Sequence, residues 1–172
     1  MLAAMLRDYD CDIQNPGIVP DSLEALQSAL RMAAADILVT IGGASVGDHD
    51  LVRPALLAAG ASIDFWKVAM RPGKPLMAGR LGTSIVLGLP GNPVSAFVTA
   101  TLFLKPLVEA LSGAANPFPL RHTAILEGSL PSTGPRIDHV RARWAAGHVT
   151  PVGPNDSAAL FTLAASDILI IR

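Results

Sequence analysis

The chain has 172 residues, of which 51% are hydrophobic and 16% charged, and its formal net charge is -1 at pH 7. A chain of this length can bury a core in one ordinary domain, with or without a small appendage. A near-neutral charge with no run of like charge excludes the electrostatic footprint of a nucleic-acid-binding or membrane-surface protein, and a single cysteine excludes an internal disulfide or a cysteine-based metal cluster.

Two further features indicate where the protein works. Residues 1–10 lack the basic flank, long apolar region and cleavage site of a signal peptide, and the lone Cys11, expected to be a small buried residue, fits a reducing compartment. The most apolar segment, residues 93–104, stops at Lys105-Pro106, short of the ~20 residues that span a bilayer. We therefore expect a cytoplasmic protein with no membrane partner, in which this segment is a core helix.

Strand and helix patterns alternate up to Gly113. Asp21 with Glu24 forms a capping-box pattern at the start of one amphipathic stretch, and the apolar run 37–41 is typical of a strand buried in a parallel sheet. In chain order we expect a helix end at 2–6, a short strand within 11–20, a helix at 20–35, a strand at 36–41, a helix at 50–60, strands at 62–70, 75–79 and 84–89, and a helix at 93–111 kinked near Pro106. This alternation predicts a three-layer α/β domain.

The pattern changes after Gly113. Residues 114–120 have the composition of a linker, and only short alternating segments follow, separated by turn residues. We expect strands at 122–128, 137–144, 148–153, 159–164 and 167–172. The sequence therefore predicts an α/β domain at 1–113 and a small β domain at 114–172.

The loop at 40–50 follows a predicted buried strand and is rich in glycine. Gly42, Gly43 and Gly47, with Ser45, supply backbone N–H groups that can cradle an anion before a helix N-terminus. Their spacing is neither that of a dinucleotide-binding loop nor that of a Walker loop. Two aspartates end the loop at positions 48 and 50. Asp48 is interpreted as a helix cap, whereas for Asp50 a cap and a role in holding a divalent cation or orienting a water are equally good interpretations.

The loop at 65–75 concentrates positive charge. Lys67, Arg71 and Lys74 surround a Pro-Gly turn, and the general interpretation of such a cluster is a solvated turn. The flanking residues are apolar, however, and Pro72 and Pro75 stiffen the backbone, which reduces the entropy lost when a ligand is bound. Rigid cations beside apolar walls suit an oxyanion or a phosphate.

The third loop joins the strand at 84–89 to the helix that follows it. Asn92 can cap that helix, Pro93 takes its first position, and Pro90-Gly91 fixes the approach of the chain, so that the junction through Ser95 forms a rigid helix N-terminus. A well-capped helix explains most of this pattern. Such a terminus can also face a phosphate or a ring.

Together, "GGASVGDHD", "FWKVAMRPGKP" and "GLPGNPVSAF", in this order and at this spacing, resemble the molybdopterin-binding domain of MoeA-type molybdopterin molybdenumtransferases, whose eukaryotic counterpart is the gephyrin E domain. The resemblance covers nearly the whole chain, and the strand-rich tail resembles the family's C-terminal β-barrel-like domain. It implies a MogA-like α/β/α fold with a mostly parallel sheet, followed by that β domain.

The resemblance also implies a chemistry. Family members take adenylylated molybdopterin, cleave its phosphoanhydride with a divalent cation, here expected to be Mg²⁺, and insert molybdate to give molybdenum cofactor with release of AMP. Asp50 would be the acidic active-site residue, and Lys67, Arg71 and Lys74 would engage phosphate and molybdate. The other positions expected to bind substrate are Gly42, Gly43, Ser45, Gly47, Asp48, Pro90, Gly91, Asn92, Pro93 and Ser95.

Three further positions match the family pattern. Asp21 falls where the family has another active-site aspartate, so Asp21 and Asp50 are the expected metal ligands. Arg141 matches the second arginine of an R-x-x-aromatic-x-R pattern, although His139 and Val140 stand where an aromatic residue is expected. Ser157 matches the serine of a Gln-Gly-Ser pattern.

The departures from the family restrict these expectations. Family members carry upstream domains and an initial strand with a Thr-Gly-Asp-Glu-Leu-like motif, so we expect a first strand to be missing and the chain alone to turn over poorly. Arg71 replaces what is usually a lysine. Alternatives to the transferase are an adenylyltransferase that uses ATP, and a non-catalytic dimerisation or scaffolding module. The expected partners are small-molecule substrates and a second copy of the chain.

Overall fold

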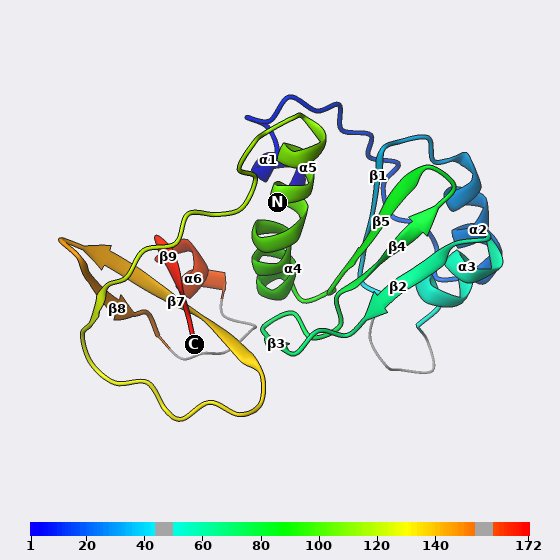
Figure 1. The fold of residues 1–172 in the computed structure, drawn as a ribbon. Helices are drawn as coiled ribbons and strands as arrows, with labels where there is room; N and C mark the ends of the chain where they lie inside the picture. The colour runs from blue at the N-terminus through cyan, green and yellow to red at the C-terminus, as the bar shows by residue number, and fades with distance from the viewer. Residues whose placement is uncertain (44–49, 154–159) are drawn as a thin grey trace.

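The computed structural model describes residues 1–43, 50–153 and 160–172, and Figure 1 shows two sheets separated by a central helical column. The helices are α1 (Leu2–Met5), α2 (Leu23–Met32), α3 (Val52–Ala58), α4 (Pro93–Thr99), the π-helical segment η1 (Ala100–Leu104), α5 (Lys105–Leu111) and α6 (Leu160–Ala164). The strands are β1 (Ile37–Ile41), β2 (Ser62–Trp66), β3 (Met70–Arg71), β4 (Met77–Leu81), β5 (Ser84–Leu89), β6 (Ile125–Leu126), β7 (Ile137–Ala145), β8 (His148–Pro151) and β9 (Ile168–Ile171).

The first sheet has the order β1-β5-β4-β2 and mixed strand directions. β1 and β5 are parallel, whereas β5 pairs antiparallel with β4, and β4 pairs antiparallel with β2. The expectation of a mostly parallel sheet is therefore wrong. The reason is local: only Gly82 and Thr83 separate β4 from β5, and a connection this short can join only antiparallel strands.

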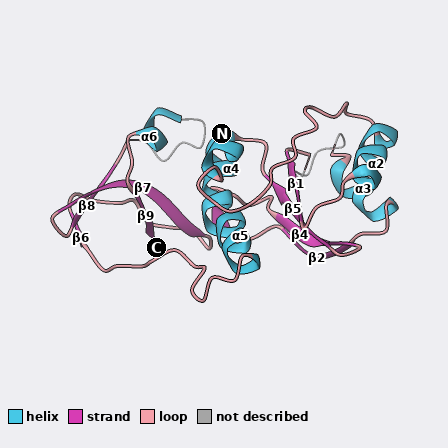
Figure 2. Cartoon of the chain, turned by 90° about the horizontal axis from the view of Figure 1, so that it is seen from above, coloured by secondary structure: helices cyan, strands magenta, loops and turns pink. Residues whose placement is uncertain are grey.

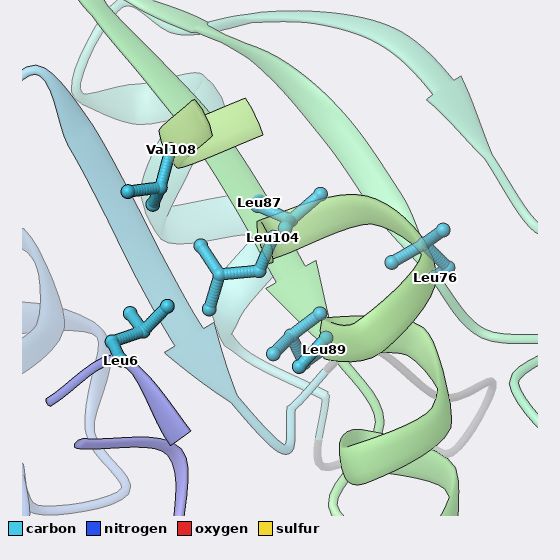
Figure 3. Packing of buried hydrophobic residues seen from close by; sticks show 7 residues of the cluster. Leu6, Leu76, Leu87, Leu89, Leu104 and Val108 are labelled. Carbon is cyan, nitrogen blue, oxygen red and sulfur yellow. The ribbon is translucent and has the colours of Figure 1, made fainter. Parts of the chain in front are cut away.

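Helices cover both faces of this sheet, which confirms the three-layer α/β architecture. On one face, α2 and α3 pack through Leu30 and Leu56 against Val86 of β5. On the other, Leu6, which follows α1, and Leu104 of the central column pack against β5, as Figure 3 shows. Because successive side chains of a strand point to opposite faces, β5 contributes to both clusters and is the centre of the core.

The central column runs through α4, η1 and α5. Asn92 caps it as expected, since its Oδ1 accepts a hydrogen bond from the N–H of Ser95 at 3.1 Å and Pro93 occupies the first turn. The π segment just before Pro106 accommodates a residue that has no N–H to donate to the preceding turn. The stretch Pro93–Leu111 is long and apolar enough to cross a membrane by length and composition, but half of it is buried, as expected of a core helix.

The second sheet contains β3, β7, β8 and β6 in that order, with β9 also paired to β7. Four of its strands come from the predicted β region, but β3 is supplied by the cationic loop. The strand predicted at 159–164 is wrong, because Leu160–Ala164 forms α6 instead. Leucine and alanine dominate this segment, and the spacing of Leu160, Leu163 and Ala164 is helical, which outweighed the apparent alternation.

Three local expectations in the first domain are also wrong. No strand forms within 11–20, where Gly17 donates from its N–H to Oδ1 of Asn15 in a turn. Ser22 rather than Asp21 caps α2, accepting from the N–H of Ala25 at 3.2 Å. Cys11 is exposed rather than buried. Asn15 and Gly17 favour a turn over a strand, and Ser22 competes with Asp21 as the cap of α2.

Candidate functional site

The three loops singled out in the sequence leave one edge of the first sheet. β1 and β5 are parallel, and two successive antiparallel pairings give β2 the same direction, so the carboxyl ends of β1, β5 and β2 lie at a common edge. The first and third loops touch there, since a Cβ on Gly91 would lie 3.3 Å from the Cα of Gly42. A Cβ at Gly91 would be a tight contact, whereas one at Gly42 would lie at an ordinary 3.7 Å from the Cα of Gly91.

The glycine loop turns sharply at Gly42 and Gly43. Both have a positive φ, 82° and 63° respectively, in the left-handed region that favours glycine. A Cβ on Gly43 would also come within 2.3 Å of the side chain of Val52. These two glycines thus fit the expected turn, while Ser45, Gly47 and Asp48 lie outside the described residues.

Asp50 and Asp21 form an acidic pair at the end of this loop. Both carboxylate oxygens of Asp50 are buried and have no hydrogen-bond partner in the described part of the chain. Burial raises the pKa of Asp50, and the negative charge of Asp21 raises it further. A carboxylate without partners beside another carboxylate is what a divalent cation would neutralise, so these residues fit the expected metal.

Over the described ranges there is no group of three acidic, histidine or cysteine side chains able to hold a metal by themselves. Two carboxylates suffice for Mg²⁺, which usually keeps several waters and takes further ligands from substrate phosphates. Asp21 and Asp50 therefore fit a cation that is completed by substrate rather than a closed structural site.

Lys67 begins the cationic loop in a left-handed conformation, with a φ of 72°. Its Nζ lies 4.0 Å from the centre of the Trp66 ring, and the guanidinium of Arg53, just beyond the glycine loop, lies 4.7 Å from the same ring. Trp66 therefore links the cationic loop to α3, which follows the glycine loop. The N–H of Lys67 also donates to the carbonyl of Leu76 at 2.9 Å and closes the loop.

Two cavities adjoin the cationic loop. The first, of about 250 Å³, is lined by Arg71, Lys74, Ser95 and Arg136 with residues 72, 73 and 75. The second, of about 470 Å³, shares Lys74 and Arg136 and adds Lys67. No acidic side chain lines either one among the described residues. The described part of the glycine loop lines neither cavity, and it meets the third loop at Gly91.

Arg136 was missed by sequence reasoning. It lies in an exposed stretch just before β7, and only the pairing of β3 with β7 brings it to the cationic loop. Its place as the first arginine of the Arg-x-x-x-x-Arg spacing that ends at Arg141 is the signal that could have found it. Arg141 itself is buried in β7, and Ser157 lies outside the described residues.

Arg71 is held by a buried carboxylate. Its Nη2 donates to Oδ2 of Asp138 at 2.5 Å, and Nη2 of Arg172 lies 3.4 Å from the same oxygen. Burial alone would raise the pKa of Asp138, but the hydrogen bonds and charges of the two arginines lower it overall. Asp138 is therefore ionised at neutral pH. Burial lowers the pKa of the adjacent His139.

Ser95 joins the third loop to the first cavity. Its N–H and its Oγ both donate to Oδ1 of Asn92, at 3.1 Å and 3.3 Å. Ser95 is buried and lines the cavity between Arg71 and Lys74. Of the remaining third-loop positions, Pro90 is buried, whereas Gly91 and Pro93 are exposed.

The protein is a three-layer α/β protein that gathers cations, tight glycine turns and two carboxylates at one sheet edge, the edge at which proteins of this class bind ligands. Residues 1–110 match the family described as "Probable molybdopterin binding domain", and the chain belongs to this family. This confirms the family resemblance, and with it the three-layer α/β fold, although the sheet is not mostly parallel.

The curated relatives that the chain matches are longer than it is. The chain is 36% identical over 140 residues to "Molybdopterin molybdenumtransferase" of Haemophilus influenzae, covering 80% of this chain and 34% of that protein. It is 33% identical over 179 residues to "Molybdopterin molybdenumtransferase 2" of Mycobacterium tuberculosis, covering 99% of this chain and 44% of that protein. The chain thus spans less than half the length of these relatives.

Solved structures share the fold. A "Molybdenum cofactor biosynthesis protein" from Pyrococcus furiosus superposes with a TM-score of 0.78 at 23% identity, covering 99% of this chain and 56% of that chain. A "moeA protein" from Pyrococcus horikoshii gives a TM-score of 0.74 at 23% identity and covers 99% of this chain and 40% of that chain. At this identity the likeness establishes the arrangement of both sheets and no more.

Proposed function

We propose that this chain is the molybdopterin- and oxyanion-binding part of a molybdopterin molybdenumtransferase, which inserts molybdate into adenylylated molybdopterin and releases AMP. The names of the relatives support the reaction, and the site supports the placement of its substrates. The observation that carries the proposal is the cavity of about 250 Å³ in which Arg71, Lys74 and Arg136 meet Ser95. A tetrahedral dianion is the ligand that three cations and a hydroxyl around one cavity bind best.

The substrate phosphates belong at the other end of the site. The turn at Gly42 and Gly43 brings backbone close to the third loop, and a bound phosphate there would lie between the oxyanion cavity and the acidic pair. In this arrangement Lys67 and Lys74 neutralise the negative charge of the substrates. Arg71 and Arg136 orient the oxyanion, and Pro72 and Pro75 form part of the cavity wall.

Asp50 and Asp21 would hold a Mg²⁺ ion in the complex with substrate. The ion would supply neutralisation of phosphate charge, and the protein contributes two carboxylates that need a cation. Both oxygens of Asp50 are buried without a partner in the described ranges, which supports this assignment. Because the cation would bind at Asp50 and the nearby Asp21, the phosphoanhydride that it contacts would lie beside these two residues.

The assay is molybdate-dependent release of AMP from adenylylated molybdopterin. The chain is tested alone and with the N-terminal region of a full-length relative added, because the relatives are more than twice as long as the part matched here. We expect release only in the supplemented reaction, and loss of release in Lys74→Ala. ATP consumption without molybdate would instead indicate an adenylyltransferase, and no reaction in either condition would indicate a non-catalytic module.

We also propose that the protein works in the cytoplasm as a homodimer. Fully or largely exposed apolar side chains support an association surface: Met32 is 81% exposed, Leu120 85% and Ile18 99%. The single cysteine, Cys11, is free and is compatible with a reducing compartment. Sedimentation analysis of the purified chain tests the dimer.

A further inference from the structure

Asp138 is a buried carboxylate to which the proposed chemistry assigns no role. Its side chain is 2% exposed, and it lies in β7, outside the three loops of the site. A buried carboxylate is costly unless it is paired and hydrogen-bonded, so its partners show what it does.

The backbone of Asp138 is fixed on both sides. On one side, β7 pairs in parallel with β3, so that Asp138 lies opposite Arg71. On the other, the N–H of Asp138 donates to the carbonyl of Arg172 at 2.9 Å, and the carbonyl of Asp138 accepts from the N–H of Arg172 at 3.1 Å. The carboxylate is therefore a rigid point next to the cationic loop.

Arg71 extends from this point to the cavity. One of its nitrogens, Nη2, bonds to Asp138, while the side chain remains 40% exposed and lines the cavity of about 250 Å³. Its Nε is buried and has no hydrogen-bond partner in the described part of the chain. A guanidinium is planar and carries five donors in a fixed geometry, so fixing one nitrogen fixes the direction of the others.

We infer that Asp138 is a positioning residue for oxyanion binding, because it orients the guanidinium of Arg71 toward the cavity through their hydrogen bond. This inference rests on the proposed function only in that the ligand of the cavity is a tetrahedral oxyanion. It also gives the arginine at position 71 a role that a lysine would fill less well, since one planar group bonds both to Asp138 and to the ligand.

If Asp138 acted only through its negative charge, removing it would strengthen anion binding, whereas removing a positioning residue would weaken it. Its negative charge lies next to a cavity lined by three cations, so removing that charge would make the cavity more positive and tighten anion binding. Positioning predicts weaker binding. The direction of the change therefore separates the two roles.

The experiment is calorimetric titration of molybdate into the full chain and its variants at constant ionic strength. We expect Asp138→Ala to weaken binding about tenfold, which is the usual effect of losing a hydrogen bond to a charged group. Asp138→Asn keeps an acceptor for Nη2 but not the charge, and should weaken binding only about threefold. Arg172→Ala is the matched control: it removes the other arginine from the same carboxylate, and should change affinity less than about twofold.

The double variant tests whether Asp138 acts through Arg71. In an Arg71→Ala background, Asp138→Asn should leave molybdate affinity unchanged, since there is no guanidinium left to orient. If circular dichroism shows that Asp138→Ala does not fold, the effect of Asp138→Asn with and without Arg71 tests the positioning role instead. Binding by the Asp138 variants that equals or exceeds that of the wild type would overturn the inference.

Lys74→Ala separates this inference from the proposed function. Lys74 lines the cavity without contacting Asp138 in the described structure, so its loss must weaken molybdate binding if the cavity is the site. A wild-type chain that does not bind molybdate, or a Lys74→Ala variant that binds it normally, would refute the site itself. Normal binding by Asp138→Ala alongside weakened Lys74→Ala would refute only the positioning role.

Discussion

Replacing Asp50 with asparagine should make the protein more stable at neutral pH. The carboxylate has both oxygens buried without a partner among the described residues, and burial followed by the charge of Asp21 raises its pKa. An acid whose pKa is raised by folding adds stability that is complete below its unfolded pKa, about 3.9, and that is lost as the pH rises through the folded pKa. At pH 7 the charged group therefore destabilises the fold.

The size of the gain follows from the burial. An unsatisfied buried polar group costs about 1–3 kcal/mol, and the asparagine amide keeps part of this cost, so we expect Asp50→Asn to gain about 1 kcal/mol. For a chain of this length that is a rise in Tm of about 2–4 °C. Urea unfolding at pH 7 and pH 4 measures it, and the gain should shrink at the lower pH as the wild-type carboxyl takes up a proton.

Two controls sharpen the Asp50 experiment. Asp64→Asn, at an exposed aspartate of β2, should change stability by less than about 0.5 kcal/mol. Mg²⁺ at about ten times its Kd should stabilise the wild type by about 1.4 kcal/mol and leave Asp50→Asn unchanged, which removes the advantage of the variant. An Asp50→Asn protein that is less stable than the wild type at pH 7, or whose advantage is the same at both pH values, would refute the reasoning.

Gly43→Ala should lower the free energy of unfolding in urea by about 3 kcal/mol, because its Cβ would lie 2.3 Å from the side chain of Val52 and the residue would have a positive φ. Gly82→Ala is the control, since Gly82 has a φ of 58° and open space around it, and it should cost about 1 kcal/mol from backbone strain alone. Equal costs for the two variants would contradict the clash with Val52. Lys74→Ala should weaken molybdate binding about tenfold with an unchanged Tm. The control Arg80→Ala, at an exposed residue of β4, should change neither the affinity for molybdate nor the Tm. The pKa of Asp138 is lowered, so the stability that its carboxylate adds is present above the unfolded pKa and is lost as the pH falls through the folded pKa. Asp138→Asn should therefore lower the free energy of unfolding by about 2 kcal/mol at pH 7 and by progressively less toward pH 3. A difference between variant and wild type that stays constant with pH would show that the ion pair contributes nothing.

Features set by neighbouring residues could be predicted from the sequence. The cap of α4 depends on Asn92, Pro93 and the N–H of Ser95, which lie within four positions of each other, and it forms as expected. The same local reasoning was one residue off at α2, because Asp21 and Ser22 are both good caps and their order in the chain does not say which one the backbone selects. Local chemistry therefore predicts the presence of a helix start more accurately than it predicts the residue at which the helix starts.

Features set by pairing between distant segments could not be predicted. Arg71 and Asp138 are 67 positions apart, and their contact depends on a two-residue strand pairing that leaves no periodic pattern in the sequence. Arg136 reaches the cavity by the same pairing. The sequence thus identified the cationic loop through its composition, whereas the partner that holds its arginine and the cation that completes its cavity became visible only in three dimensions.

The cavity of about 250 Å³, the proposed oxyanion site, is lined both by residues of the α/β domain and by Arg136 of the tail. Figures 1 and 2 show the helical column between the two sheets, and Met70 of β3 packs with Val94 and Val98 of that column and with Leu169 of β9. The cationic loop is therefore held on one side by the α/β core and on the other by the tail. Because Arg136 lines the cavity and Asp138 bonds to Arg71, the proposed anion site draws on the tail sheet, whereas the described contacts of the glycine turn lie within the α/β core.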